Sequence, residues 1–307
     1  MANVSVIIVN WNTQDYLERC LAALYRTENA TVKDVWVVDN ASSDGSVGMV
    51  KAKFPQVCLI ENEQNVGFAR ANNQALRAST ADLVLLLNSD AFLEEGCLTR
   101  LVAVMQTNPD TGAAGARLLN ADHTLQRSCY AFPTLSTELW QTLGFDRLFA
   151  SSPFFGKFLM TDWAMDDFRV VDVVMGAVML LRRQTLEQVG HLDESFFMYS
   201  EEVDLCYRMA QAGWKVRYVP DAWAVHLWGG SSKKVKAETL LRLYRSRVQL
   251  FRKHYGKWTA FLYKGLIVFN SLTRTILGCL VVAFTKNTDL WEKTKGYWRL
   301  LSQAPGF

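Results

Sequence analysis

The stretch "ADLVLLLNSDAF" (residues 81–92) joins an apolar run to an abrupt polar end. Residues 83–87 are all Leu or Val, as in a strand that is buried on both faces of a sheet. The run stops at Asn88, Ser89 and Asp90. A carboxylate at the end of a buried strand costs stability unless something cationic meets it. The stretch therefore predicts a buried strand with a ligand site at its end.

Similar segments surround this one and alternate with helical patterns. We expect strands at residues 4–10, 34–40, 57–62 and 82–90, and helices at 13–26, 46–54, 67–79 and 97–108. This alternation predicts an α/β fold in which parallel strands are covered by helices on both faces. Ligands bind such sheets at the carboxyl ends of the strands.

Polar residues stand at all four expected strand ends. They are Asn10 and Asn12, Asp39 and Asn40, Asn62 and Asn65, and Asn88, Ser89 and Asp90. At each end taken alone, helix capping or turn formation remains an alternative, because Asn and Asp serve both purposes. Four converging polar ends favour a shared binding site.

The chain beyond residue 119 is less regular. Residues 120–170 are rich in aromatic side chains, and we expect either a lid or acceptor-side wall there, or a helical excursion that packs on the sheet. Residues 170–183 have the pattern of a strand pair. Gly176 and Ala177 leave a small-residue gap in this pair, where a ligand could approach closely.

Acidic residues gather at the start of a helix predicted after residue 200. Glu201, Glu202 and Asp204 stand there, and the helix dipole alone would favour some of them. The spacing of the apolar residues leaves Glu202 at the rim of the helix, where a carboxylate could take a proton from a sugar hydroxyl. His226 ends a later strand and is either a packed side chain or, beside an Asp-lined pocket, a metal or phosphate partner.

The charge is uneven along the chain. The net charge is +3, but residues 229–307 carry fifteen Lys or Arg against three Asp or Glu, so the remaining chain is acidic. Residues 237–255 predict a helix with an apolar stripe and a basic face. Residues 258–284 are apolar but interrupted by Lys264 and Arg274, so we expect them to lie in a membrane surface or form a hairpin, not to span it. The long apolar runs favour lipid over nucleic acid.

Two further features bear on the compartment. The six cysteines are scattered without a CxxC pair, which favours reduced thiols in the cytoplasm. The first residues enter a strand almost at once, so no signal peptide is expected.

Seven motifs occur in the order of a known family. They read "VSVIIVNWN", "VVDNASSDGS", "NVGFARANN", "LLLNSDAF", "VVMGAVMLLRR", "FFMYSEEVDLCYR" and "AVHLWGGSS". With them the chain resembles the inverting glycosyltransferases of family 2, in the rhamnosyltransferase-like branch. The resemblance covers residues 4 to about 232. It implies a GT-A domain at 1–232, with a Rossmann-like mixed sheet, followed by a helical, basic, membrane-associating region at 233–307.

The resemblance also implies roles for individual residues. The donor, a nucleotide-diphosphate sugar, would be bound by Val9, Asn10, Asn12, Asp39, Asn65, Gly67, Phe68, Arg70, Asn72, Asn88, Ser89 and Gly176. Asp90 would hold Mg²⁺ or Mn²⁺, with His226 as the second protein contact. Glu202 stands at the position of the catalytic base, with Glu201 and Asp204 as alternatives. The chain departs from the family pattern at Asn88, where an Asp is usual, and at Glu202, where the base is commonly an Asp.

Together these features predict an enzyme that transfers a sugar to a lipid-linked saccharide acceptor, and the resemblance alone implies rhamnose from dTDP-rhamnose as the first donor to consider. It would act peripherally at the cytoplasmic face of the plasma membrane in cell-surface polysaccharide synthesis. A non-catalytic nucleotide-sugar binder or membrane scaffold with a decayed site is the alternative, and a homodimer remains open. A nucleotidyltransferase would need a Gly-rich phosphate loop after the first strand, and "NWNTQDYL" has none.

Overall fold

The computed structural model describes residues 3–27, 32–227 and 236–307. The predicted boundary between residues 232 and 233 and the end of the "AVHLWGGSS" motif lie outside these ranges. The chain packs as two compact units. The first comprises Met1–Phe132, Leu159–Phe197 and Glu201–Ser231, and the second comprises Pro133–Phe158, Met198–Ser200 and Ser232–Phe307.

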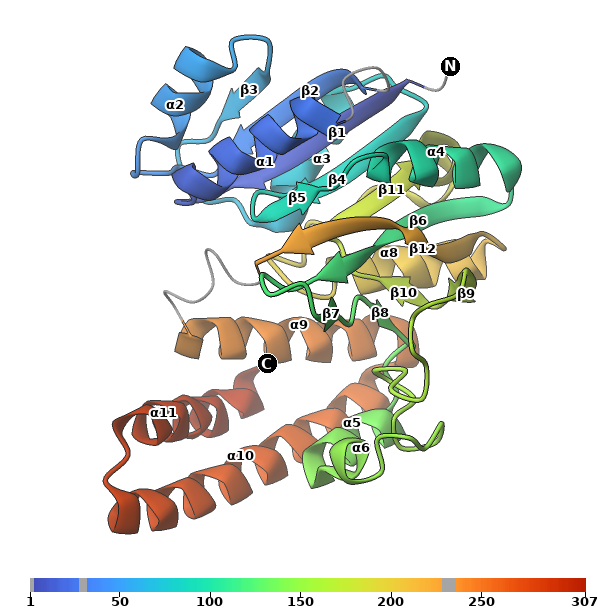
Figure 1. Ribbon diagram of the computed structural model, residues 1–307. Coiled ribbons are helices and arrows are strands. Elements are labelled where there is room, and N and C mark those ends of the chain that lie inside the picture. The colour runs from blue at the N-terminus through green and yellow to red at the C-terminus, as the bar shows by residue number, and fades with distance from the viewer. Residues whose placement is uncertain (1–2, 28–31, 228–235) are drawn as a thin grey trace. The chain divides into compact units, whose positions relative to one another are not determined.

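The first unit is built on a mixed sheet, which has ten strands within the described residues (Figure 1). The order along the main path is β3-β2-β1-β4-β11-β6-β12-β5, with β7 beside β6 and β9 beside β12. These strands are β1 (Val4–Asn10), β2 (Val32–Asp39), β3 (Cys58–Glu61), β4 (Leu83–Asn88), β5 (Ala91–Leu93), β6 (Thr111–Leu119), β7 (Leu125–Gln126), β9 (Arg169–Val171), β11 (Val178–Arg182) and β12 (Lys215–His226). A separate pair joins β8 (Cys129–Tyr130) to β10 (Val173–Val174).

The pairing directions confirm the predicted mixed sheet. β1, β2, β3 and β4 pair in parallel, as the strand–helix alternation predicts. β11 runs antiparallel to both β4 and β6, whereas β12 is parallel to β6. The helices of this unit are α1 (Gln14–Thr27), α2 (Ser46–Lys53), α3 (Phe68–Ala78), α4 (Cys97–Thr107), α7 (Arg183–Val189) and α8 (Glu201–Gln211).

Burial on both faces explains the apolar runs of the central strands. Leu83, Leu85 and Leu87 of β4 share one core cluster with residues of α1, α2 and α4. Val84 and Leu86 point to the opposite face and are equally buried. A strand that is covered on both sides has no solvent-facing position, so its sequence shows no alternation.

The second unit is helical within its described residues. It contains α5 (Leu135–Leu143), α6 (Phe145–Leu148), α9 (Lys236–Tyr255), α10 (Lys257–Thr285), α11 (Thr288–Gln303) and the 3-10 turn η2 (Ala304–Gly306). A capping box between Thr134 and Thr137 begins α5. The helical part of the second alternative for residues 120–170 is therefore confirmed at 135–148, where α5 packs against α10.

α10 corrects one expectation. Residues 257–285 form one continuous helix, so the hairpin alternative for 258–284 is wrong. Lys264 and Arg274 have high helix propensity and do not break it. α10 is long and apolar enough to cross a membrane by length and composition, and it is the one such helix in the described ranges.

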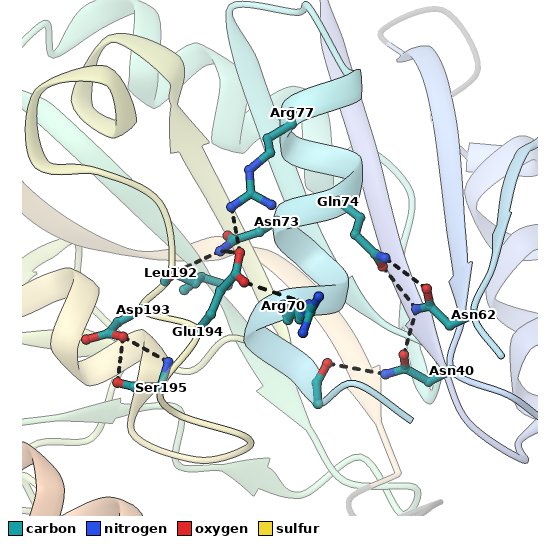
Figure 2. Close-up of polar contacts among 11 residues, drawn as sticks. Asn40, Asn62, Arg70, Asn73, Gln74, Arg77, Leu192, Asp193, Glu194 and Ser195 are labelled. Atoms are coloured by element: carbon teal, nitrogen blue, oxygen red, sulfur yellow. Dashed lines mark hydrogen bonds and ion pairs between the residues drawn. The ribbon is translucent and has the colours of Figure 1, made fainter. Parts of the chain in front are cut away.

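In the first unit, hydrogen bonds clamp the loop of residues 192–197 onto α3. Asn73 and Arg77 of α3 donate to Glu194 Oε1, at 3.0 and 2.6 Å (Figure 2). Asn73 also donates to the carbonyl of Leu192, and these bonds to Asn73 and Arg77 lower the pKa of Glu194. The clamped loop carries Phe197, whose carbonyl accepts a 2.7 Å hydrogen bond from the amide of Phe68. The loop between residues 192 and 197 is therefore tied to both ends of α3.

Gly67 precedes α3 and lies against Phe197 of the clamped loop, so its substitution tests this close approach. Its φ is +89°, and a Cβ there would lie 2.5 Å from the Phe197 carbonyl oxygen. We expect Gly67→Ala to destabilise the protein by about 2–4 kcal/mol, because the conformation suits only glycine and the contacting atom is backbone. Urea unfolding measures the effect.

Gly48 in α2 is the matched control, since nothing lies within 4 Å of its Cβ position. Gly48→Ala should be neutral or stabilise the protein by about 0.5–1 kcal/mol. Equal unfolding midpoints for the two variants would contradict the close approach at Gly67.

Candidate active site

The register of the sheet brings three predicted strand ends to one edge. Asn10 pairs with Asp39 at the ends of β1 and β2, and Val9 pairs with Asn88 at the end of β4. The predicted convergence of these carboxyl ends is therefore present. Asn62, just after β3, donates from its amide to Asn40 Oδ1 at 2.9 Å and adds a fourth strand end (Figure 2).

Asn10 and Asp39 form a buried hydrogen-bonded pair. The amide of Asn10 donates to Asp39 Oδ1 at 2.9 Å and to Ser42 Oγ at 3.1 Å. The second oxygen of Asp39 accepts the backbone amide of Ser42 at 2.8 Å. The backbone amide of Asn12, a residue at φ 54°, donates to Ser42 Oγ. The side-chain oxygen of Asn12 accepts from the backbone amide of Ser43. These bonds hold the Asp39 carboxylate and the turn after β2 in one orientation.

Thr13 extends this network to the end of β4. Its hydroxyl contacts Asn10 Oδ1 at 2.7 Å and Ser89 Oγ at 2.9 Å. Thr13, Asn10 and Ser89 are all buried. A continuous chain of side chains therefore joins Asp39 to Ser89, the neighbour of Asp90.

Asp90 lies beside His226. The antiparallel pairing of β12 with β5 sets Ala91 opposite His226, and the amide of Leu227 donates to the Asp90 carbonyl at 3.0 Å. His226 Nε2 is then 3.3 Å from Asp90 Oδ1, and both side chains are at least nine-tenths buried. Asn88 Nδ2 lies 3.4 Å from the same His226 nitrogen.

Gln126 assigns the tautomer of His226. The Gln126 amide nitrogen donates to the His226 carbonyl at 3.1 Å and to Asn120 Oδ1 at 2.9 Å, so its oxygen is left to face His226 Nδ1 at 2.6 Å. Nδ1 therefore carries the proton and donates it to Gln126. In the neutral ring, Nε2 then presents a lone pair toward Asp90.

The Asp90–His226 pair fits a divalent cation. With Nε2 unprotonated, two acceptors lie 3.3 Å apart, and a cation between them would be attracted to both. Adjacent ligands of an octahedral ion with bonds of about 2.1 Å are about 3.0 Å apart, close to this spacing. The described ranges contain no cluster of three or more His, Cys, Asp or Glu that could hold a metal. Two ligands suffice for Mg²⁺ or Mn²⁺ that is also held by substrate phosphates.

Glu202 approaches the same edge through Gly176. The amide of Asn88 donates to the carbonyl of Ala177 at 2.9 Å, which places the small-residue gap beside the end of β4. A Cβ on Gly176 would lie 3.7 Å from the Cβ of Glu202. Gly176 therefore lies against Glu202, at the distance of an ordinary van der Waals contact for an added Cβ.

The other two acids have different surroundings. Burial, reinforced by the charge of Glu202, holds the pKa of Glu201 well above its usual range. Glu201 Oε2 is buried and accepts no hydrogen bond from the described residues. Asp204 is fully buried and accepts from Arg208 Nε at 2.8 Å, and Arg208 also binds the carbonyls of residues 189–191. These contacts give Asp204 a structural partner on its own helix.

The remaining predicted residues lie around the start of α3. Asn65 Oδ1 accepts the amide of Gly67 at 3.0 Å, and the amide of Phe68 is bound to Phe197. Asn72 is buried and donates to the carbonyl of Phe68 in its own helix. Arg70 is mostly exposed, with Nε 3.9 Å from Glu194 (Figure 2). Their roles at the donor remain predictions.

Three residues of this edge escape the sequence interpretation: Thr13, Ser42 and Gln126. Thr13 follows the motif VSVIIVNWN and Ser42 lies within VVDNASSDGS, so the neighbourhood of a strand end is the available signal. Gln126 lies in a two-residue strand 100 positions before His226 and has no local signal.

Known proteins match both the sequence and the fold. Residues 5–160 match the profile "Glycosyl transferase family 2", and residues 83–301 match "Glycosyl transferase family group 2". One relative, the N-acetylglucosaminyl-diphospho-decaprenol L-rhamnosyltransferase of Mycobacterium tuberculosis (strain CDC 1551 / Oshkosh), is 29% identical over 83% of this chain and 86% of its own. Another, the rhamnosyltransferase WbbL of Escherichia coli (strain K12), is 26% identical over 73% of this chain and 83% of its own.

A solved structure supports the fold assignment. The mannosyltransferase PcManGT of Pyrobaculum calidifontis, in complex with GDP-Man and Mn²⁺, superposes with a TM-score of 0.57 at 18% identity, over 98% of this chain and 85% of the other. This likeness confirms the predicted GT-A fold. Since the family profile matches half of the sequence, the chain belongs to glycosyl transferase family 2.

Proposed function

We propose that this chain transfers a sugar, with inversion, from a nucleotide-diphosphate donor to a lipid-linked saccharide acceptor. L-Rhamnose from dTDP-rhamnose is the first donor to test, and cell-surface polysaccharide synthesis at the cytoplasmic membrane face is the setting. The Mycobacterium tuberculosis relative supports this choice, because its name gives L-rhamnose transfer and a diphospho-decaprenol-linked N-acetylglucosamine.

The observation that carries the proposal is the single polar network at the sheet edge. It runs from Asp39 through Asn10 and Thr13 to Ser89, and ends beside the Asp90–His226 pair. A nucleotide diphosphate needs polar groups for its ribose or base at one end and charge compensation for its phosphates at the other. The network supplies both kinds of group in a continuous order.

Asp90 and His226 would hold the divalent ion, and the ion when bound would offset charge that develops on the leaving diphosphate. Asp90 contributes a hard oxygen ligand, and Gln126 fixes the ring of His226 so that Nε2 faces the ion position. Asn88 carries no charge, so of the two residues Asn88 and Asp90 at the end of β4 only Asp90 contributes a carboxylate. Asp39 and Asn10 would orient the nucleoside end of the donor.

Glu202 is the base that the geometry favours. Glu201 is more buried than Glu202, with a pKa raised chiefly by that burial, and Asp204 is bound to Arg208. Glu202 would take the proton from the acceptor hydroxyl as that oxygen attacks the anomeric carbon and the nucleotide diphosphate leaves. A single displacement of this kind inverts the configuration and needs one carboxylate.

The second unit would dock on the membrane that carries the acceptor. Nearly all exposed large hydrophobic side chains of the described residues belong to this unit; Phe168, Val170 and Phe197 are the exceptions. On α10 the exposed apolar residues include Trp258, Phe261, Leu262, Phe269, Leu272, Ile276, Leu277, Leu280, Val281 and Phe284. A helix with one packed face and one exposed apolar face suits the plane of a lipid surface.

A donor screen tests the proposed function directly. We expect dTDP-rhamnose to raise the melting temperature only when Mn²⁺ or Mg²⁺ is present, because the ion and the donor phosphates bind together. UDP- and GDP-sugars serve as comparisons. Asp90→Asn should abolish the metal-dependent shift, and a shift that is equal with and without metal would contradict the assigned pair.

Glu202→Gln tests the base. We expect turnover to fall by about 10²–10⁴-fold while the donor-induced thermal shift is unchanged, since the amide keeps the shape but cannot accept the proton. Glu187→Gln, on the exposed surface of α7, is the control and should be fully active. A parent protein without turnover on any donor would favour the non-catalytic binder instead.

Gln126→Met tests the tautomer assignment. Loss of the acceptor for Nδ1–H should weaken Mn²⁺ binding by about 10–100-fold, as read by the electron paramagnetic resonance of free Mn²⁺. Gln211→Met, at the exposed end of α8, should bind Mn²⁺ like the parent. Unchanged Mn²⁺ affinity in the Gln126 variant would refute the role of this residue.

A further inference from the structure

The second unit contains a cavity of about 440 Å³ with a basic lining. It lies between the last turns of α9, the first turns of α10 and Phe307. Four of its lining residues are cationic: Arg245, Arg252, Lys257 and Lys264. The apolar lining comes from Val248, Ala260, Phe261 and Phe307. The lining includes no acidic side chain from the described residues.

Like charges around one hollow raise its positive potential. Arg245 already makes a cation–π contact, because its guanidinium lies over the Phe307 ring at 5.3 Å from the centroid. Arg252 and Lys257 are exposed, and neither forms an ion pair with the described part of the chain. The cavity is therefore suited to an anion with several acceptor oxygens, and phosphate matches Arg and Lys donors well.

The position of Phe261 indicates where that phosphate comes from. Phe261 lines the cavity and also belongs to the exposed apolar surface of α10, next to Trp258, which is 81% exposed. If this surface lies in lipid, the cavity stands at the level of the headgroups, where Trp side chains also prefer to be. The cationic side chains of the cavity would then contact the phosphate of a lipid, and the apolar side chains would contact its acyl chains.

We propose that this cavity binds the phosphate of an anionic phospholipid headgroup and so anchors the second unit in a fixed orientation. The proposal rests on the membrane-surface part of the proposed function and does not depend on catalysis. It identifies four residues that bind a specific headgroup, beyond the diffuse attraction of a basic region to an anionic surface.

Co-sedimentation of the full chain with lipid vesicles tests this site. The vesicles are phosphatidylcholine alone or phosphatidylcholine mixed with phosphatidylglycerol. For Arg252→Gln/Lys257→Gln we expect binding to the mixed vesicles to weaken by about thirtyfold, with binding to phosphatidylcholine unchanged. The control Lys293→Gln/Arg299→Gln removes the same charge from exposed positions of α11 outside the cavity, and should lose less than about threefold.

The other outcomes separate the sources of failure. Equal losses of binding to the mixed vesicles in the two double variants would overturn the proposed headgroup site, because diffuse charge attraction would then account for the binding. If inorganic phosphate raises the melting temperature of the parent but not of the cavity variant, and mixed vesicles bind both alike, the ligand is free phosphate and the lipid proposal is overturned. A parent that binds no vesicle would refute the membrane part of the proposed function as well, whereas turnover on a soluble acceptor reports on catalysis alone.

Discussion

The antiparallel pairing of β5 with β12 is the constraint on which the candidate site depends. β4 and β5 are separated by only two residues, yet β4 lies in the middle of the sheet and β5 lies beside β12 at its edge. Two residues are too short a link to cross the intervening strands, so the end of β12 must lie close to the end of β4, where Ala224–His226 pair with β5. Ser89 and Asp90 form this link, and the pairing of Ala91 with His226 brings the imidazole beside Asp90.

Much of the first unit could be predicted from sequence because its signals are local. Buried strands such as residues 83–87 and their polar ends are readable without a fold, and parallel pairing then brings the ends together. β6, with the sequence TGAAGARLL, was not predicted, because Gly and Ala are poor strand formers. The structure explains that composition: a Cβ on Gly115 would lie 2.5 Å from Val174. The close packing at Gly115 requires a small residue, and small residues have low strand propensity, so the sequence does not indicate this strand.

The roles of the three acids could not be sorted from sequence for a related reason. Glu201, Glu202 and Asp204 all stand in the first turn of α8 and share the same local preferences. Their difference comes from burial and from contacts in the folded chain: burial and the charge of Glu202 act on Glu201, Arg208 of the same helix binds Asp204, and Gly176 lies against Glu202. Likewise, Gln126 acts on His226 from 100 positions away. Long-range contacts of this kind leave no periodic pattern in the chain.

α10 reverses the usual distribution of polarity in a water-soluble helix, and this bears on the medium around the second unit. Asn270 is buried, donates to the Tyr244 hydroxyl at 3.1 Å and accepts from Arg274 Nε at 2.7 Å, whereas Phe269 and Leu277 are exposed. In water, burying the amide has no advantage and exposing the large apolar groups is costly. The arrangement becomes favourable when the exposed face meets hydrocarbon and the polar groups hydrogen-bond within the helical unit. A helix that lay in the membrane interface would also keep Lys264 and Arg274 within reach of water or headgroups.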